Sequence, residues 1–298
     1  AYDAGTFTQT SLFVTTPNGG LGGFWMAGGG VAADSNGNVF IASGNGDFDT
    51  VNVPARELGD TVMKLFNTGN PTLSLIDYFT PFDQSMLDGE DQDVGSGGVM
   101  LLPDQPGSTP HELVQAGKAG TIHLVDRDQM TTNNLHYCQS CSSDTQITQE
   151  IQESITQNWL FSTPAYFNST VYFCGCGEAG PGDNLKGFSL TNGLLSTSPT
   201  ETSANLFQFP GCTPSASGSG NANGVIWAVN TSTYGNAGAS LGPAVLYAYQ
   251  AGTLSMLWNS SQTGSDTAGN AVKFAVPTVA NGKVYLGTQT ELDVYGTH

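Results

Sequence analysis

The two ends of the chain carry nearly the same short sequence. Residues 1–7 read AYDAGTF and residues 248–254 read AYQAGTL, and each is followed within a few positions by Ser-Leu-Phe or Ser-Met-Leu. A recurring unit of strand, turn and strand is typical of propellers and solenoids, because one such unit cannot bury its apolar face alone. The repeat therefore predicts a fold built from similar β units before any chemistry is considered.

Between the two ends, five segments share one internal pattern. Each has an apolar strand that often holds Pro or Gly, a turn, a strand rich in Val, Ile or Tyr, and a strand ending near Gly. Strand alternation and Gly/Asn turns mark these units. We predict one all-β domain over residues 1–298, a β-propeller of about five four-stranded blades. The blades are expected at residues 22–82, 93–153, 158–203, 206–262 and 272–298, the last one together with residues 1–15.

The fifth segment contains only three strands. Its end, LDVYG, matches the place in the fourth segment where VLYAYQ leads into AGTL. We therefore expect the N-terminal strand, Thr8 to Thr15, to complete the last blade and remove an exposed sheet edge. Two alternatives stay open: whole blades are missing upstream, or the phase match is a coincidence.

The charge balance limits the classes of partner. The 298 residues hold 25 Asp and Glu against 7 Lys and Arg, a formal net charge of −18. Such a chain repels phosphate backbones and anionic membrane surfaces, so we expect no nucleic acid partner. No apolar run approaches the roughly 18 residues of a membrane span. Five cysteines in a polar, Thr/Ser/Asn-rich chain favour an extracellular or periplasmic location.

The cysteines allow two interpretations. We favour disulfides among Cys138, Cys141, Cys174 and Cys176, with unknown connectivity and one of the five cysteines left unpaired. The alternative is a zinc or iron site built from the HxCxxC run that starts at His136, together with Cys174 and Cys176. The tight Cys-x-Cys spacing argues against it.

Other motifs suggest little chemistry. The Asp34–Asn38 turn resembles the start of a calcium loop, but it lacks the distal Glu and lies between two strands, so we expect a hairpin. His111, His123 and His298 are isolated in the sequence, and nothing supports a Ser-His-Asp arrangement.

The densest group of candidate residues lies between Gly22 and Arg127. It contains the runs GGFWMAGGG, SGNGDFD followed by GDTV, EDQDVGSGGVML, and VQAGKAGTIHLVDRD. With these runs the chain resembles the pyrroloquinoline quinone (PQQ)-like propellers, the repeat family that includes quinoprotein alcohol dehydrogenases and polyvinyl alcohol dehydrogenase. At repeat level the resemblance covers essentially the whole chain.

The resemblance implies roles for Trp25 and Asn45. Trp25 falls at the position of the family's tryptophan floor, on which the flat quinone lies. The alternative is a tryptophan packed between blades. Asn45 falls at the position of a side-chain amide ligand of calcium, an ion that prefers oxygen ligands. Its alternative is a simple Asn-Gly turn.

The resemblance also implies a catalytic carboxylate and a cation. Asp93 is the better match to the carboxylate that takes the alcohol proton as hydride passes to the quinone, with Asp91 as the second choice. Lys118 falls on the cation that hydrogen-bonds the quinone oxygens. The alternatives are a solvated acidic turn and a surface lysine.

Two main functions follow from these observations. The resemblance implies a secreted, PQQ-dependent oxidoreductase of alcohols or sugars with PQQ and calcium, and no haem because a Cys-x-x-Cys-His run is absent. The family's ligands from blades before the tryptophan strand have no counterpart. The alternative is a non-catalytic propeller that binds or scaffolds a protein partner. A carbohydrate lyase or hydrolase is a third possibility, although no characteristic carboxylate pair is present. Fold resemblance alone does not choose among them.

Overall fold

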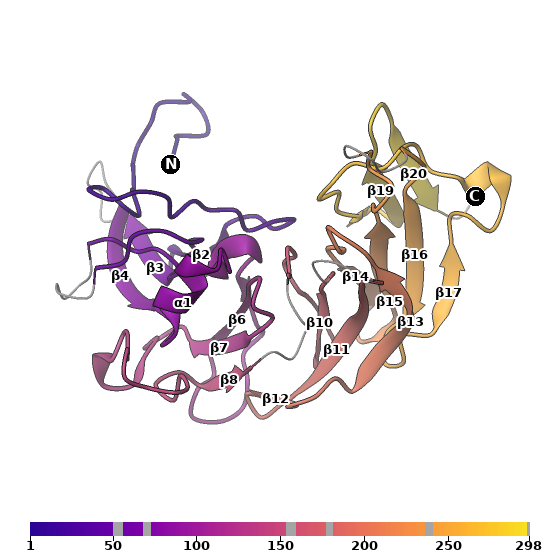
Figure 1. Cartoon of the computed structure of the whole chain (residues 1–298). Coiled ribbons are helices and arrows are strands. Elements are labelled where there is room, and N and C mark those ends of the chain that lie inside the picture. Colours follow the sequence, from indigo (N-terminus) through magenta and orange to yellow (C-terminus); the bar gives the residue numbers. More distant parts are fainter. Residues whose placement is uncertain (50–55, 68–72, 153–158, 177–180, 236–240, 297–298) are drawn as a thin grey trace.

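A computed structural model describes residues 1–49, 56–67, 73–152, 159–176, 181–235 and 241–296. In these ranges the chain forms five antiparallel sheets, and α1 (Gln84–Gly89) is the one α-helix. The sheets follow one another along an open arc, with the first and last sheets at its two ends (Figure 1). The predicted all-β fold of propeller type is confirmed, and three of the five sheets have the predicted four strands, whereas the third has five and the fifth has three. The sheets do not close into a ring (Figure 1). Residues 153, 158 and 298, at which predicted blades begin or end, lie outside the described residues.

The first two sheets each have four strands in chain order. The first contains β1 (Ala32–Ala33), β2 (Asn38–Ala42), β3 (Val62–Asn67) and β4 (Leu73–Phe79), and the second contains β5 (Met100–Leu101), β6 (Glu112–Ala116), β7 (Ile122–Asp126) and β8 (Gln149–Ile151). The helix α1 and a short 3₁₀ turn, η1 (Val94–Ser96), connect them.

The remaining sheets follow the same antiparallel plan. The third contains β9 (Ala165–Phe167), β10 (Thr170–Cys174), β11 (Asp183–Thr191), β12 (Leu194–Leu195) and β13 (Glu201–Phe207), and the fourth contains β14 (Ser215–Ser219), β15 (Ala222–Asn230), β16 (Val245–Gln250) and β17 (Met256–Asn259). The fifth has three strands: β18 (Thr278–Ala280), β19 (Lys283–Gly287) and β20 (Leu292–Gly296).

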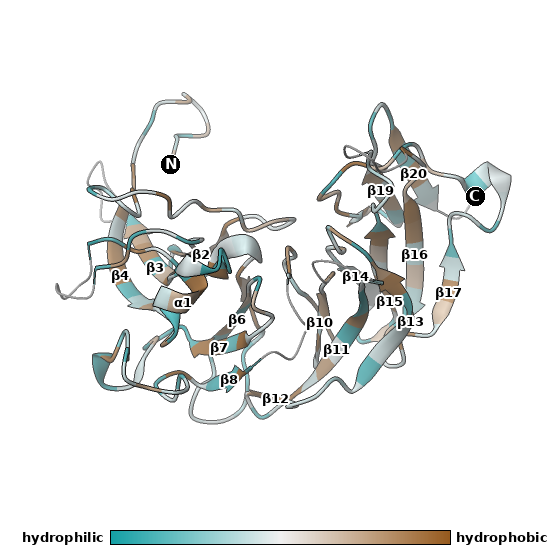
Figure 2. Ribbon diagram, viewed as in Figure 1, coloured by the Kyte–Doolittle hydropathy of each residue, from teal (hydrophilic) through white to brown (hydrophobic). Residues whose placement is uncertain are grey.

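A hydrophobic core lies between each sheet and the next. On β6, Leu113 packs in the core shared with the first sheet, whereas its neighbour Val114 packs in the core shared with the third. Successive side chains on a strand point to opposite faces, so one strand supplies two cores. Two further cores join the third sheet to the fourth and the fourth to the fifth. In Figure 2 the hydrophobic residues accordingly concentrate on the strands.

The repeat at the two ends of the chain folds into the same turn. The Asp3 amide donates to the Thr8 carbonyl at 2.9 Å and the Phe7 amide to the Asp3 carbonyl at 2.8 Å. At the second copy, Gln250 and Leu254 repeat both bonds, to Ser255 and to Gln250, each at 2.9 Å. Phe7 and Leu254 even share a left-handed backbone, with φ of 55° and 49°. Similar sequences thus form the same local turn.

The predicted closure of the last blade by residues 8–15 is wrong. The fifth sheet consists of β18, β19 and β20 alone. The N-terminal segment lies instead beside the first sheet, where Leu12 and Thr15 accept hydrogen bonds from the amides of Leu73 and Leu58 at 3.2 and 2.9 Å. Phe13 packs against the first core. Partial burial of this phenylalanine stabilises the segment beside the first sheet.

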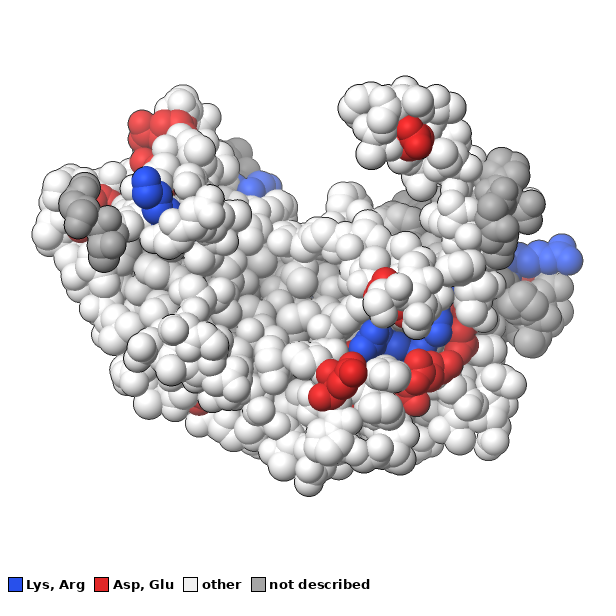
Figure 3. All heavy atoms as spheres, turned by 180° about the vertical axis from the view of Figure 1, so that it is seen from behind, with Lys and Arg blue, Asp and Glu red and all other residues white. Residues whose placement is uncertain are grey.

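Charged side chains are sparse on the face shown in Figure 3. On the face in Figure 3, the main group of Lys and Arg side chains lies among Asp and Glu, and much of the remaining surface is uncharged. Among the described residues, no helix is long and apolar enough to cross a membrane.

The predicted hairpin at Asp34–Asn38 is confirmed, since the Asp34 amide donates to the Asn38 carbonyl at 3.0 Å.

Candidate functional site

The segment that carries Trp25 connects three sheets. The amides of Met26 and Ala27 donate to the carbonyls of Gly95 and Ser96 at 2.8 and 3.1 Å, and the Ala27 carbonyl accepts from the Thr163 amide at 3.1 Å. These bonds fix the segment over the loops that lead into the second and third sheets. Trp25 itself remains 67% exposed. Such exposure is unlike a tryptophan packed between blades.

Gly44 brings the Trp25 ring and the Asp93 carboxylate together. A Cβ at this position would collide with Asp93 Oδ1 and would lie 3.0 Å from the Trp25 indole. The missing side chain therefore makes room for both groups beside the same stretch of backbone. The adjacent Asn45 amide donates to Asp93 Oδ1 at 2.8 Å.

Asp93 and Lys118 form a buried ion pair. The Lys118 ammonium lies 2.5 Å from Asp93 Oδ2 and 3.0 Å from Asp91 Oδ2. The side chains of Lys118 and Asp93 are 9% and 6% exposed, whereas that of Asp91 is 70% exposed. Burial alone would lower the pKa of Lys118, but hydrogen bonds to Asp93 and Asp91 raise it above the usual lysine value. Lys118 is therefore a cation at neutral pH, and it is not a surface lysine.

The structure thus brings together the candidate residues predicted between Gly22 and Arg127. Trp25, Asn45, Asp93 and Lys118 come from four separate segments and meet beside Gly44. Asp91 lies at the exposed edge of the ion pair, where both its carboxylate and its carbonyl contact the Lys118 ammonium. Asn45 reaches Asp93 through its backbone amide.

An aromatic row, absent from the sequence-based prediction, extends from this site. Ring centroids are 5.6 Å apart for Trp159 and Phe161, 5.4 Å for Phe161 and Phe209, and 6.1 Å for Phe161 and Phe274. The Lys118 ammonium lies 5.8 Å from the Trp159 ring and 5.9 Å from the Phe161 ring, within the range of cation–π attraction. The sequence did contain a sign of this row, because each of these aromatic residues lies shortly before the first strand of the third, fourth or fifth sheet.

Asp60 is a buried carboxyl behind Asp93 that the sequence-based prediction also missed. It is fully buried, and its Oδ1 accepts a hydrogen bond from the Val94 amide at 3.0 Å. Burial raises the pKa of Asp60 to about 8, and the charge of Asp93 adds to the increase. By holding Val94, Asp60 positions the backbone next to Asp93. In the sequence, only the Gly59-Asp60 pair before β3 pointed to this residue.

We expect Asp60→Asn to change how stability depends on pH. Between an unfolded pKa of about 3.9 and the folded pKa of about 8, the folded state holds a proton that the unfolded state has released, so wild-type stability falls as pH rises. Asparagine keeps the acceptor for Val94 and tolerates the φ of 48°. Relative to wild type, the variant should gain about 3 kcal/mol of unfolding free energy between pH 5 and pH 7 in urea titrations. An equal difference at both pH values would contradict this assignment.

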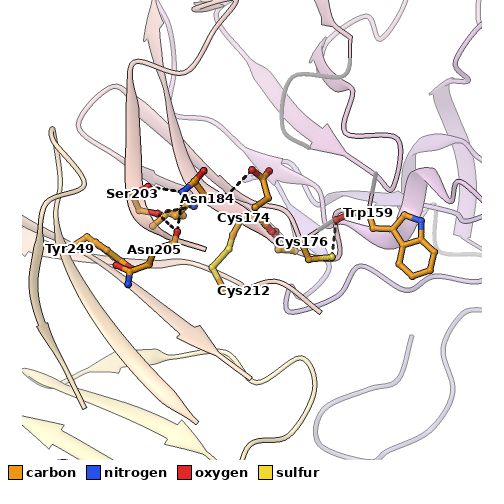
Figure 4. The surroundings of a disulfide bond; sticks show 11 residues. Trp159, Cys174, Cys176, Asn184, Ser203, Asn205, Cys212 and Tyr249 are labelled. Carbon is orange, nitrogen blue, oxygen red and sulfur yellow. Dashed lines mark hydrogen bonds between the residues drawn. A yellow bond between two sulfur atoms is a disulfide. The ribbon is translucent and has the colours of Figure 1, made fainter. Parts of the chain in front are cut away.

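The disulfides are Cys138–Cys141 and Cys174–Cys212, and Cys176 is a buried free thiol. The prediction of a disulfide at Cys176 is therefore wrong, and Cys212 takes its place. A turn at Gly211, with φ of 80°, places Cys212 against the end of β10. The Cys176 thiol instead donates to the Trp159 carbonyl at 3.1 Å (Figure 4). Burial raises the pKa of this thiol to about 12.

The alternative of a zinc or iron site at the HxCxxC run is also wrong. Cys138 and Cys141 are consumed by their disulfide, and Cys174 is consumed by its bond to Cys212. His136 stacks on Tyr78 with ring centroids 4.2 Å apart, and its Nδ1 lies 2.8 Å from the Tyr78 carbonyl oxygen. It therefore packs as part of the loop rather than as a ligand.

Comparisons with known proteins add a distant likeness. A scan of protein-family models finds no match, and a search of curated proteins finds none. Among solved structures, the chain is similar to the quinohemoprotein alcohol dehydrogenase from Comamonas testosteroni, with a TM-score of 0.47 and 13% identity over 90% of this chain and 44% of that chain. The chain thus spans less than half the length of that protein. A likeness of this degree assigns no role to any residue.

Proposed function

We propose that the chain binds a flat quinone-class ring on the exposed face of Trp25 and acts as a quinoprotein-type oxidoreductase of alcohols or sugars. The observation that carries this proposal is the meeting of Trp25, Asp93 and Lys118 from three separate segments. An aromatic face beside a protonated ammonium suits a flat ring with oxygens at its edge.

The residues present fit such a ring. Gly44 leaves a space that a Cβ would fill, between the Trp25 indole and Asp93. Trp25 is exposed and can stack. The Lys118 ammonium now donates to Asp93 and Asp91, and the N–H that it frees on leaving Asp93 Oδ2 can donate to an oxygen at the ring edge. When bound, a quinone of this class supplies a hydride acceptor. The remaining chemistry is the removal of a hydroxyl proton, which falls to a carboxylate.

We assign this role to Asp93, whose Oδ2 would accept the hydroxyl proton. In the described conformation the Lys118 ammonium occupies Oδ2 and the Asn45 amide occupies Oδ1. Lys118 also contacts Asp91, so it can release Oδ2 while a second carboxylate still balances its charge. Lys118 thereby positions and orients Asp93 until a substrate hydroxyl takes its place.

We do not include calcium in the proposed site. Calcium takes six to eight oxygen ligands. Both Asp93 oxygens already accept hydrogen bonds, and the Lys118 ammonium holds the place beside the carboxylates where a metal cation would sit. The Asn45 side chain adds one amide oxygen. We therefore derive no step that involves calcium at Asn45.

One observation favours a second candidate, a non-catalytic binding protein. The Asp93 side chain is only 6% exposed and both of its oxygens are occupied. A sugar or other ring ligand could stack on Trp25 without reacting while this ion pair stays closed. For either function we infer an extracellular or periplasmic location, because the two disulfides require an oxidising compartment to persist.

The full chain titrated with PQQ tests the proposal. We expect saturable quenching of tryptophan fluorescence and reduction of a redox dye when an alcohol or sugar is added. Trp25→Ala should weaken binding about tenfold because the stacking face is lost. Trp258→Phe, a change in the fourth sheet, is the matched control and should bind like wild type.

The outcomes separate the two candidate functions. Saturable binding without dye reduction by any alcohol or sugar would overturn the oxidoreductase and leave the binding protein. Absence of binding to a folded chain, or equal binding by the Trp25→Ala variant, would overturn the site itself.

A further inference from the structure

A second group of polar side chains lines a cavity on the other side of the Asp93 and Lys118 backbone. The cavity has a volume of about 520 Å³ and lies between α1 and the paired strands β7 and β8. Val94 and Gly117, neighbours of the ion pair, form part of its wall, as do Leu87, His123 and Glu150. The proposed quinone site makes no use of it.

Three potential metal ligands come together at the wall of this cavity, and two of them, His123 and Glu150, line it. One nitrogen of His123 and one carboxylate oxygen each of Asp144 and Glu150 all lie within 4.8 Å of one another. Two ligand atoms of a tetrahedral metal with bonds of about 2.1 Å are roughly 3.4 Å apart, so side-chain rotations that draw these atoms closer would complete the arrangement. His123, isolated in the sequence, therefore has two acidic neighbours in the fold.

Strand pairing fixes two of the three ligands. His123 on β7 and Glu150 on β8 are direct partners in the antiparallel register, so both side chains stand on the same face of the sheet. Asp144 precedes β8, and its amide donates to Glu150 Oε2 at 2.9 Å. The Asp144 carboxylate in turn accepts bonds from the Phe82 amide at 3.0 Å and from the Gln146 side chain at 2.8 Å. These donors orient the carboxylates in the way that outer-shell partners orient metal ligands.

Gln115 fixes the tautomer of the His123 ring. The Gln115 Nε2 donates to the Val94 carbonyl, which leaves its Oε1 facing His123 Nδ1 at 3.2 Å. An amide oxygen can only accept, so Nδ1 carries the proton and Nε2 carries the lone pair. His123 is 4% exposed, and no hydrogen bond to Nε2 is formed among the described residues. A histidine held by its other ring nitrogen is the usual form of a metal ligand.

The local charge also calls for a cation. Asp144 is buried and Glu150 is partly buried, and neither forms an ion pair with Lys or Arg in the part of the chain that the structure describes. Two ionised carboxylates close together in a low-dielectric interior are costly, and either a bound proton or a positive charge between them relieves the cost.

From this geometry we propose that His123, Asp144 and Glu150 bind a divalent first-row transition metal ion, with its remaining coordination positions facing the cavity. Imidazole nitrogen favours zinc and the ions from iron to copper over manganese, calcium and magnesium, which prefer oxygen ligands. Water in the cavity would complete the coordination, as at zinc sites with an open position.

Cobalt titration of the full chain, after dialysis against a chelator and without quinone, tests this site. We expect visible absorption that saturates at about one ion per chain, is displaced by zinc and is unaffected by calcium. A thiolate charge-transfer band should be absent, because Cys176 is not a ligand. Glu150→Gln and His123→Gln should each weaken cobalt binding at least about tenfold, while circular dichroism reports whether each variant is folded.

His111→Gln is the matched control. His111 is an exposed histidine whose ring nitrogens lie 2.7 Å from Asp128 and 3.9 Å from Asp104, so it offers the same ligand types at the surface. This variant should keep wild-type affinity. The proposal is overturned if wild type shows no saturable binding, if a folded Glu150→Gln variant binds cobalt as tightly as wild type, or if His111→Gln abolishes binding. None of these outcomes depends on quinone binding.

Discussion

Lys118→Met is expected to lower the free energy of unfolding by about 3 to 5 kcal/mol, the cost of leaving one partner of a buried ion pair without the other. The Lys118 ammonium contacts Asp93 Oδ2 at 2.5 Å, and both side chains are less than one tenth exposed. Methionine keeps much of the apolar stem but removes the charge, so Asp93 would remain as an uncompensated buried carboxylate. Urea unfolding at neutral pH measures the loss.

The double variant Lys118→Met/Asp93→Asn is the control for that result. Removing both charges relieves the uncompensated carboxylate, and the asparagine oxygen can still accept from the Asn45 amide. The double variant should therefore recover most of the lost stability. If it is no more stable than Lys118→Met, the ion pair is not the source of the effect.

Loss of the Cys174–Cys212 disulfide is expected to cost about 4 kcal/mol of unfolding free energy. The bond closes a segment with a sequence separation of 38, and the entropy of closing such a loop in the unfolded chain has about this size. The double variant Cys174→Ala/Cys212→Ala leaves no new thiol next to Cys176. Chemical denaturation under oxidising conditions measures the difference.

The second disulfide supplies a control within the same chain. Cys138–Cys141 spans a sequence separation of only 3, for which loop closure contributes about 1.5 kcal/mol. Cys138→Ala/Cys141→Ala should therefore be the milder double variant. The reverse order would show that the long loop does not govern stability.

The local features of the fold could be predicted from the sequence, because they depend on neighbours along the chain. The repeat that ends at Phe7 and Leu254 forms the same turn twice, and the Asp34–Asn38 hairpin follows from its turn residues. Alternation on β6, which places Leu113 and Val114 in different cores, follows from the period of a strand.

Only those residues of the candidate site that belong to a recognisable sequence motif could be predicted. Trp25, Asp93 and Lys118 were found through the resemblance, and they do meet. Two other features could not be predicted: the aromatic row at Trp159 and Phe209, and the disulfide partner of Cys174. Both depend on which loops of neighbouring sheets lie side by side, and residue spacing along the chain does not reveal this.

Long-range pairing also explains the two largest surprises. In the sequence, no potential metal ligand lies next to His123. The antiparallel register of β7 and β8 brings Glu150 beside it. By repeat phase, residues 8–15 were expected to pair with the fifth sheet, but they lie beside the first sheet, where the partly buried Phe13 packs against the first core. Repeat phase specifies which strands are alike, and packing decides which strands are adjacent.

A crystal structure of the full chain grown with PQQ tests the central claim most directly. The account predicts planar ligand density stacked on the Trp25 indole, with a ring oxygen within hydrogen-bonding distance of the Lys118 ammonium. Planar density bound elsewhere, or a bare Trp25 face at saturating PQQ, would contradict it.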